Sequence, residues 1–304
     1  MPVPATRVRP FDDAGIAEAA ALILAGQPVA VPTETVYGLA ADATNGEAVA
    51  RIYAAKGRPS FNPLIVHVPD LAAAERIGIF DTGARALAAE HWPGPLTLVV
   101  PLREPSGVAS LVTAGLPTIA LRVPAHPAMQ ALLQATGRPL AAPSANVSGR
   151  ISPTRAEHVL ASLDGRIPLI LDAGATDRGI ESTIIGASGG QLRLLRPGPI
   201  EVPDALQVEG GIEAPGMMTS HYAPSKPLRL NVTTAENNEW LIGFGPVEGT
   251  STLSVTGDLV EAAAKLFAAL HEADASSAPR IAVAPVPRVG LGAAINDRLQ
   301  RAAA

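Results

Sequence analysis

The hydrophobic and polar positions follow two different periods along the first two thirds of the chain. Segments with the period of an amphipathic helix alternate with short, nearly continuous apolar segments, which are typical of buried strands. We predict helices over residues 15–27, 46–55, 82–91, 127–136 and 154–163, and strands over 28–36, 64–68, 95–102, 118–124, 140–145, 168–174, 182–186 and 191–198. This order of elements predicts an α/β domain with a mixed sheet.

Local signals support several of these boundaries. Asp12 and Asp13 precede the first helix, and Gly26 lies near its end, as expected for helix termini. A turn is predicted at Tyr37 and Gly38, after the first strand. Thr154 is followed three residues later by Glu157, which fits a capping box at the start of a helix.

The regular pattern stops after residue 206 and resumes near residue 227. The segment 207–226 contains Gly, Pro, Met, His and Tyr without a period, and a long irregular segment is commonly functional or disordered. Beyond it, strands are predicted over 228–232, 239–245, 250–255 and 281–287, and helices over 259–272 and 292–303. We therefore predict a first domain at 1–206, a linker or lid at 207–226 and a small α/β domain at 227–304.

The amino-acid composition excludes several classes of function. The 304 residues carry a net charge of −5 and include no cysteine, which excludes disulfides, thiolate metal sites, iron–sulfur clusters and cysteine nucleophiles. The acidic balance, without a basic run, argues against binding nucleic acid through phosphate neutralisation. No apolar run reaches the roughly 18 residues of a membrane helix, and the N-terminal segment carries acid where a signal peptide is apolar. We expect a cytoplasmic protein without membrane contact.

Two segments near the predicted strand ends carry polar chemistry. In PTETVYGLAADAT (32–44), threonine hydroxyls form either the wall of a pocket or an ordinary turn. In KGRPSFNPLIVHV (56–68), Lys56 and Arg58 end a helix, where its dipole favours cations, but both also suit a phosphate. Asn62 and His67 follow within the same stretch. The residues alone do not decide between a pocket wall and a turn in the first segment, or between a phosphate site and a helix cap in the second.

Further candidates lie in the second half of the first domain. The segment SANVSGRISPT (144–154) supplies hydroxyls, a glycine and a helix start, which suit either a phosphate or ribose cradle or a capped helix. Arg122 and Arg196 each end an apolar strand, so each needs a buried carboxylate or an anionic ligand as its partner. The chain has neither a Walker loop nor a G-x-S-x-G elbow, and its histidines lack the spacing of a metal site.

Taken together, the ordered segments resemble a known family. PTETVYGLA, KGRPSFNPLIVHV, PTIALRVP, APSANVSGRISPT, ESTII and LRPGPI are similar to those of the threonylcarbamoyl-AMP synthase (YrdC-type) family, and APGMMTSHYAPSKP with GLGAAINDRLQRAA resembles its long, two-domain form. The resemblance implies a YrdC-like twisted mixed sheet with helices, followed by a small Rossmann-like α/β domain. It implies a nucleotidyltransferase that converts L-threonine, bicarbonate and ATP into threonylcarbamoyl-AMP and pyrophosphate.

The resemblance also implies a role for particular residues. Matching the motifs position by position assigns Lys56 and Arg58 to catalysis. The L-threonine site comprises Thr35, His67, Arg122, Ala142 (through its backbone) and Ser182. The nucleotide site comprises Arg58, Asn62, Thr118, Ser144, Ser152, Arg196 and Tyr222, the last of these in the lid. Mg²⁺ is expected to accompany ATP, with no metal ligands from side chains alone.

The downstream partner implied by the resemblance is the machinery that transfers the threonylcarbamoyl group to tRNA. The net charge gives no indication of direct RNA binding. Two other functions remain open: a related enzyme that forms a carbamoyl-adenylate from carbamoyl phosphate, and a non-catalytic module that binds double-stranded RNA. Dependence on threonine separates the first from the synthase, and salt-sensitive RNA binding would identify the second.

Overall fold

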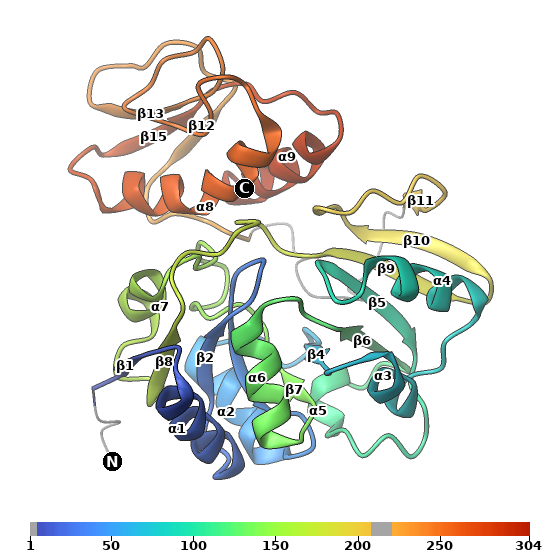
Figure 1. Cartoon of the computed structure of the whole chain (residues 1–304). Helices are drawn as coiled ribbons and strands as arrows, with labels where there is room; N and C mark the ends of the chain where they lie inside the picture. Colours follow the sequence, from blue (N-terminus) through green and yellow to red (C-terminus); the bar gives the residue numbers. More distant parts are fainter. Residues whose placement is uncertain (1–4, 208–220) are drawn as a thin grey trace.

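Two β-sheets organise the protein in a computed structural model that describes residues 5–207 and 221–304 (Figure 1). An eleven-stranded mixed sheet lies in the first domain, and a four-stranded sheet lies in the C-terminal domain. Residues 208–220, which form most of the predicted linker, lie outside the described residues. Within the described part of the chain, no helix is long and apolar enough to cross a membrane.

The large sheet has the strand order β1-β8-β2-β3-β7-β4-β6-β5-β9-β10-β11. Its strands are β1 (Arg7–Pro10), β2 (Val29–Pro32), β3 (Tyr37–Asp42), β4 (Ile65–His67), β5 (Leu96–Pro101), β6 (Thr118–Arg122), β7 (Leu140–Ala141), β8 (Leu169–Asp172), β9 (Thr183–Ser188), β10 (Gln191–Arg196) and β11 (Leu206–Gln207). Its helices are α1 (Asp13–Leu24), α2 (Gly46–Lys56), α3 (Leu71–Ile77), α4 (Thr82–His91), α5 (Ser110–Thr113), α6 (Pro127–Thr136) and α7 (Ala156–Leu163).

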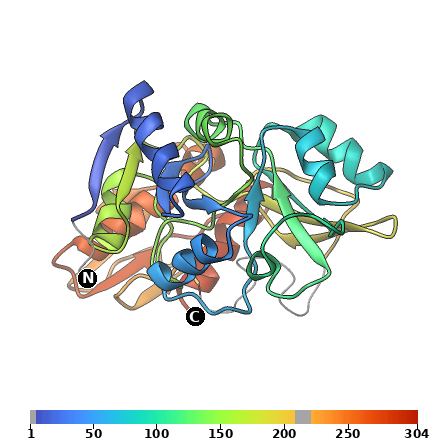
Figure 2. The same ribbon diagram turned by 90° about the horizontal axis from the view of Figure 1, so that it is seen from below.

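The two faces of this sheet are covered differently. Alternate residues of a strand point to opposite faces, so Val29 and Val31 pack with α1 and α6, whereas Ala30 joins the larger core with α2, α4 and α7. The view from below shows α1 and α6 on the opposite side of the sheet from α2 (Figure 2). Further along the face that α1 and α6 cover, the buried apolar residues form a small cluster that includes Ile65 and Ala120. That part of the face is where the polar strand ends gather.

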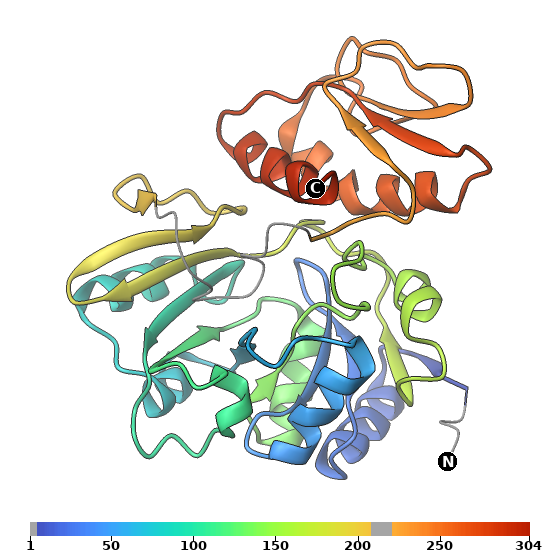
Figure 3. The same cartoon turned by 180° about the vertical axis from the view of Figure 1, so that it is seen from behind.

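The C-terminal domain is a parallel α/β unit. Its sheet, in the order β12-β15-β13-β14, comprises β12 (Leu228–Leu230), β13 (Glu239–Gly243), β14 (Ser251–Thr252) and β15 (Arg280–Val283). Its helices α8 (Leu259–Ala275) and α9 (Leu291–Ala302) face the first domain, and the sheet lies on the far side (Figures 1 and 3).

The two domains pack closely against each other. Val36, Ile151 and Ile180 of the first domain share one hydrophobic cluster with Phe267 of α8. Gly179 has φ +68°, and a Cβ there would lie 2.4 Å from two backbone oxygens of α8. Only glycine permits this approach, so the packing of the two domains requires glycine at position 179.

A pair of histidines joins the domains beside this cluster. The ring of His158 (α7) stacks on that of His271 (α8) with 3.9 Å between centroids, and His271 Nε2 lies 3.2 Å from the Ser152 carbonyl oxygen. Burial lowers the pKa of His158 to about 3, and proximity to His271 adds to that shift. Burial lowers the pKa of His271 to about 4. The contact is therefore made by two neutral imidazoles.

The predicted fold class is confirmed, and most of the predicted elements are present. The helices predicted from the apolar period are found, as are the strands along the sheet. Five elements were missed: β1, β3, α3, α5 and β11. Tyr37 and Gly38 begin strand β3 rather than a turn. The capping box was also wrong: the N-cap of α7 is Arg155, without a side-chain cap, because the Thr154 hydroxyl lies against His158 instead.

The histidine pair predicts a stability that falls in mild acid. In the unfolded chain both histidines titrate near the ordinary pKa of about 6.5, so below that pH the unfolded state binds protons that the native state does not. Each lowered pKa therefore contributes stability above about pH 6.5 that is lost as the pH falls, by at most about 1.4 kcal/mol per pH unit. Urea unfolding between pH 7 and pH 5 measures this slope, and H158Q/H271Q should flatten it. Equal slopes in the two proteins would contradict the prediction.

Candidate functional site

The central pair of the site comes from two neighbouring parallel strands. The register of β4 and β6 pairs Ile65 with Ala120 and His67 with Arg122. These residues point to the same face as α1 and α6, in the part where the small cluster with Ile65 and Ala120 lies, and the polar pair lies at the carboxyl ends of both strands. Ligands of α/β proteins commonly bind at this edge of a sheet. The fold thus places an imidazole and a guanidinium side by side.

The tight turn between β2 and β3 adds hydroxyl groups to this pair. Thr33 Oγ1 accepts hydrogen bonds from the amides of Thr35 (3.2 Å) and Val36 (3.3 Å) and donates one to the Val36 carbonyl (2.7 Å). A threonine that bonds its own turn fixes the local backbone. Thr35 Oγ1 consequently accepts a hydrogen bond from Arg122 Nη1 at 3.0 Å. The PTETV segment is therefore both a turn and a pocket wall.

Arg122 is held by a buried ion pair. Its Nη2 lies 2.6 Å from Glu34 Oε1, and the two side chains are 4% and 9% exposed. Burial is the largest single effect and would raise the pKa of Glu34, but attraction to Arg122 and hydrogen bonds together outweigh it, so the pKa is lowered. Glu34 is thus a charged carboxylate beside the Arg122 guanidinium. Of the two partners expected for Arg122, the structure contains the carboxylate, and the guanidinium still lines the cavity.

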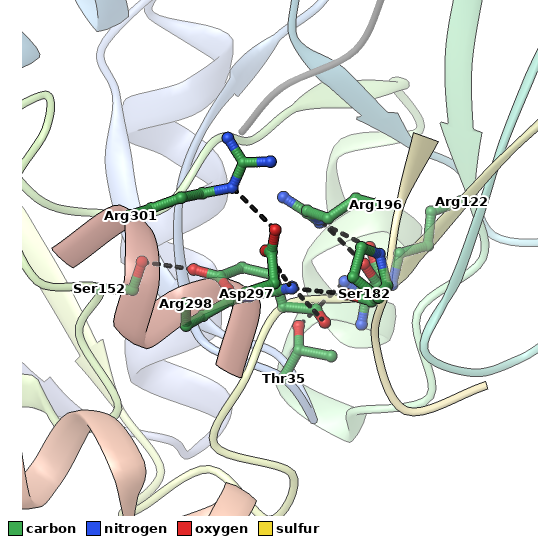
Figure 4. Close-up of polar contacts among 10 residues, drawn as sticks. Thr35, Arg122, Ser152, Ser182, Arg196, Asp297, Arg298 and Arg301 are labelled. Carbon is green, nitrogen blue, oxygen red and sulfur yellow. Dashed lines mark hydrogen bonds and ion pairs between the residues drawn. The ribbon is translucent and has the colours of Figure 1, made fainter. Parts of the chain in front are cut away.

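A second arginine closes the other side of the cavity. Arg196, at the end of β10, donates from Nε to the Ser182 carbonyl and from Nη2 to Ser182 Oγ, both at 3.1 Å. Ser182 Oγ also lies 2.7 Å from Thr97 Oγ1. Ser182 therefore connects Arg196 to the sheet and faces the same cavity as Arg122 (Figure 4).

Lys56 and Arg58 organise the loops that border the cavity. Lys56 Nζ donates to the carbonyl oxygens of Ser144 (2.5 Å) and Asn146 (2.6 Å). Arg58 donates from Nε to the Asn62 carbonyl (3.1 Å) and from Nη2 to the Pro63 carbonyl (2.8 Å). Burial lowers the pKa of Lys56 well below its usual value and that of Arg58 to about 10.

These elements enclose a cavity of about 520 Å³, part of it open to solvent. Nine of the thirteen predicted site residues line it: Thr35, Arg58, His67, Arg122, Ala142, Ser144, Ser182, Arg196 and Tyr222. The other four, Lys56, Asn62, Thr118 and Ser152, do not. Lys56 is directed to carbonyl groups, and Thr118 begins the strand that Arg122 ends. The predicted roles of all thirteen residues remain predictions.

Two residues that follow the undescribed segment cover the cavity. His221 and Tyr222 line it, and their rings meet edge to face at 4.0 Å. Tyr222 is fully buried, yet its hydroxyl has no hydrogen-bond partner among the described residues. The same holds for both ring nitrogens of His67. Buried polar groups without partners are costly, and those that face a cavity are suited to a polar ligand.

The electrostatic character of the cavity is positive. Burial lowers the pKa of His221 to about 3, and four cations add to that shift, namely Lys56, Arg58, Arg196 and Arg298. Burial likewise lowers the pKa of His67 to about 3, with Arg122 contributing in the same direction. The cavity therefore combines neutral imidazoles with guanidinium groups, which is an arrangement that binds anions. Among the described residues, no three His, Asp or Glu side chains form a group that could hold a metal ion.

Sequence reasoning missed four residues of this site: Glu34, Glu181, His221 and Arg298. Glu34 and Glu181 lie within quoted motifs, but nothing local showed that each would pair with a distant arginine. The dipeptide His221-Tyr222 was a usable signal, because two large polar ring side chains stand together in an irregular segment rich in Gly and Pro. Arg298 lies in an amphipathic helix, where a charged residue is expected on the exposed side, so its burial could not be inferred from the sequence.

Comparison with known proteins places this arrangement in a family. The family model described as "Telomere recombination" (Sua5, YciO and YrdC) matches residues 21–198. The model described as "Threonylcarbamoyl-AMP synthase, C-terminal domain" matches residues 182–304. The first covers more than half of the chain, and the second reaches its end.

Individual relatives agree with the two family models. A threonylcarbamoyl-AMP synthase of Bacillus subtilis is 40% identical over 96% of this chain and 94% of its own length. One from Pyrococcus abyssi is 38% identical over 93% of this chain and 92% of its own length. The crystal structure of P. abyssi Sua5 complexed with L-threonine superimposes with a TM-score of 0.89 at 35% identity, covering 98% of both chains.

The buried pair beneath the cavity predicts a large loss of stability in E34A. Removing one partner of a buried ion pair leaves the other charge unpaired and costs about 3–5 kcal/mol. The matched control is E18A, because Glu18 pairs with Arg9 at the surface, and exposed pairs contribute about 0–1 kcal/mol. Urea unfolding at neutral pH should separate the two variants clearly. Equal losses would show that the Arg122–Glu34 pair adds no more than a surface contact.

Proposed function

This chain belongs to the Sua5–YciO–YrdC family and carries the C-terminal domain of the threonylcarbamoyl-AMP synthases, and on that premise we propose how its cavity performs the reaction. The protein is a threonylcarbamoyl-AMP synthase that joins L-threonine, bicarbonate and ATP and releases pyrophosphate. The observation that carries this proposal is the pairing of two arginine sites, Arg122 with Thr35 and Arg196 with Ser182, in one enclosed cavity.

The first half of the cavity is suited to an amino acid. Arg122 presents a guanidinium to the carboxylate of threonine, and a planar fork matches a carboxylate better than a point charge does. Thr35, His67 and the backbone of Ala142 supply the polar groups for the amino and hydroxyl groups. The uncharged His67 imidazole accepts as well as donates a hydrogen bond.

The second half is suited to the nucleotide. Arg58 and Arg196 line it together with the hydroxyl group of Ser144. These cations offset phosphate charge, and Tyr222 closes over the same space. Mg²⁺ enters as part of the MgATP substrate, held by phosphate oxygens and water.

The chemistry then requires positioning more than covalent participation. The threonine nitrogen forms a bond to the bicarbonate carbon, with loss of water, to give a carbamate. A carbamate oxygen attacks the α-phosphorus of ATP, and the bond to the bridging oxygen of the β-phosphate breaks, so pyrophosphate leaves. Orientation of bound reactants can contribute about 7–11 kcal/mol to such a step, and fixed cations stabilise the charge that develops.

Exclusion of water is the remaining requirement. Carbamates and acyl adenylates both hydrolyse, so an enclosed site preserves them. His221 and Tyr222 cover the cavity from the direction of the C-terminal domain, which is the position of a lid. The product is expected to serve a second enzyme that transfers its threonylcarbamoyl group to an adenosine of tRNA.

Product formation tests this proposal directly. The purified protein, incubated with L-threonine, labelled bicarbonate, ATP and Mg²⁺, should form a labelled adenylate and pyrophosphate, and omitting threonine should abolish both. Absence of a threonine-dependent adenylate rejects the function. Adenylate formation from carbamoyl phosphate without threonine would instead identify the related carbamoyl-adenylate enzyme.

Substitution of Arg122 by lysine tests the assignment of the amino-acid site. R122K keeps the charge but loses the fork, so KM for L-threonine should rise about 10- to 100-fold, because a hydrogen bond to a charged group contributes about 1.5–3 kcal/mol. KM for ATP should change little. R138K is the control, since that side chain is 53% exposed. A rise in KM for ATP alone would assign Arg122 to the nucleotide.

A further inference from the structure

The C-terminal domain inserts one arginine into the wall of the cavity. Arg298 belongs to α9, and its side chain is completely buried. Burying a guanidinium costs several kcal/mol unless it is paired and hydrogen-bonded. The partners of Arg298 therefore show what it holds in place.

Two of these partners belong to the first domain. Arg298 Nε donates to Glu181 Oε2 at 3.1 Å, and Nη1 donates to the Pro197 carbonyl at 2.5 Å. Glu181 immediately precedes Ser182, and Pro197 immediately follows Arg196. One guanidinium thus connects the segment that carries Ser182 with the segment that carries Arg196 of the expected nucleotide site.

The contact continues to a further residue of the expected nucleotide site. The other oxygen of Glu181, Oε1, accepts a hydrogen bond from Ser152 Oγ at 2.5 Å. Ser152 is fully buried and does not line the cavity, so its orientation depends on this carboxylate. Figure 4 shows Arg298 and Asp297 between Ser152 on one side and Ser182 with Arg196 on the other.

Arg298 and its neighbours also hold the residues that cover the cavity. The Arg298 guanidinium carbon lies 5.7 Å from the centre of the Tyr222 ring, within the range of a cation–π contact. The backbone amide of His221 donates to the Arg301 carbonyl at 3.0 Å. Asp297 accepts from Arg298 (3.0 Å) and from Arg301 (2.9 Å), which fixes both arginines on one face of α9.

We propose that Arg298 is a positioning residue of the nucleotide site, supplied by the C-terminal domain and acting through Glu181 on Ser152 and directly on Tyr222. This inference rests on the proposed function, because it assigns Arg298 to the ATP side of that reaction. It gives the second domain a role in the site itself: without α9, Glu181 loses its counter-charge and Tyr222 loses the cation that faces its ring.

Steady-state kinetics distinguish positioning from a purely structural role. In R298M, KM for ATP should rise about tenfold or more, because misplacing orienting groups can cost up to about 100-fold, whereas KM for L-threonine should stay nearly constant. R298K, which keeps a charge for Glu181, should recover part of the effect. R280M is the matched control, since Arg280 lies in the same domain and is 52% exposed. A lower kcat with both KM values unchanged would indicate only a smaller folded fraction and would overturn the inference.

Coupling to Ser152 gives an independent readout. If Arg298 acts through Glu181, the S152A/R298M double variant should raise KM for ATP by less than the product of the two single effects, since residues in one network are not additive. Multiplicative effects would overturn the proposal. Where R298M does not fold, E181Q replaces it in the same comparison. A wild-type protein without threonine-dependent adenylate formation rejects the proposed function, whereas an active wild type with normal KM values in R298M rejects this inference alone.

Discussion

The structure depends on the cost of burying positive charge. Five cationic side chains around the cavity are less than 9% exposed, and each requires compensation: Lys56, Arg58, Arg122, Arg196 and Arg298. Two of them are satisfied by backbone carbonyls, because loops 144–146 and 62–63 fold around Lys56 and Arg58. Arg122 and Arg298 are paired with carboxylates. The result is a protein interior in which cations are fixed in position before any ligand arrives, so little reorganisation is needed when an anion binds.

This arrangement requires both domains. The sheet can align His67 and Arg122 through strand register alone, but this edge of the sheet by itself leaves them accessible to water. Helices α8 and α9 face that side of the molecule, and the closest backbone approach, at Gly179, leaves no room for a side chain. The interface therefore serves two purposes: it buries apolar surface for stability, and it lowers the dielectric around the charged groups, which strengthens their interaction with a bound anion.

The sequence predicted well those features that depend on residues close together in the chain, and it predicted poorly those that depend on residues far apart. Helices with a clear apolar period were found because the period is local. Strand β3 was missed because its Tyr37-Gly38 start resembles a turn and its remaining residues include two alanines, which have a low β-propensity, although the whole strand is buried. The motif residues lay near predicted strand ends, and nine of them do meet in one cavity. The pairs that orient them join residues far apart in the sequence, 117 positions in the case of Arg298 and Glu181, so no local pattern could reveal them.

A net charge of −5 and a cavity that attracts anions are compatible because they act over different distances. Surface charges more than about 10 Å apart are largely screened by salt, whereas buried charges are not. The net charge is a property of the whole chain, whereas the arginines that line the cavity act at short range on whatever binds inside it. Selection for an anionic substrate thus requires burial of a few cations, not a basic protein. Arg298, inserted from the second domain, is a buried cation of this kind that acts by orienting other residues of the site.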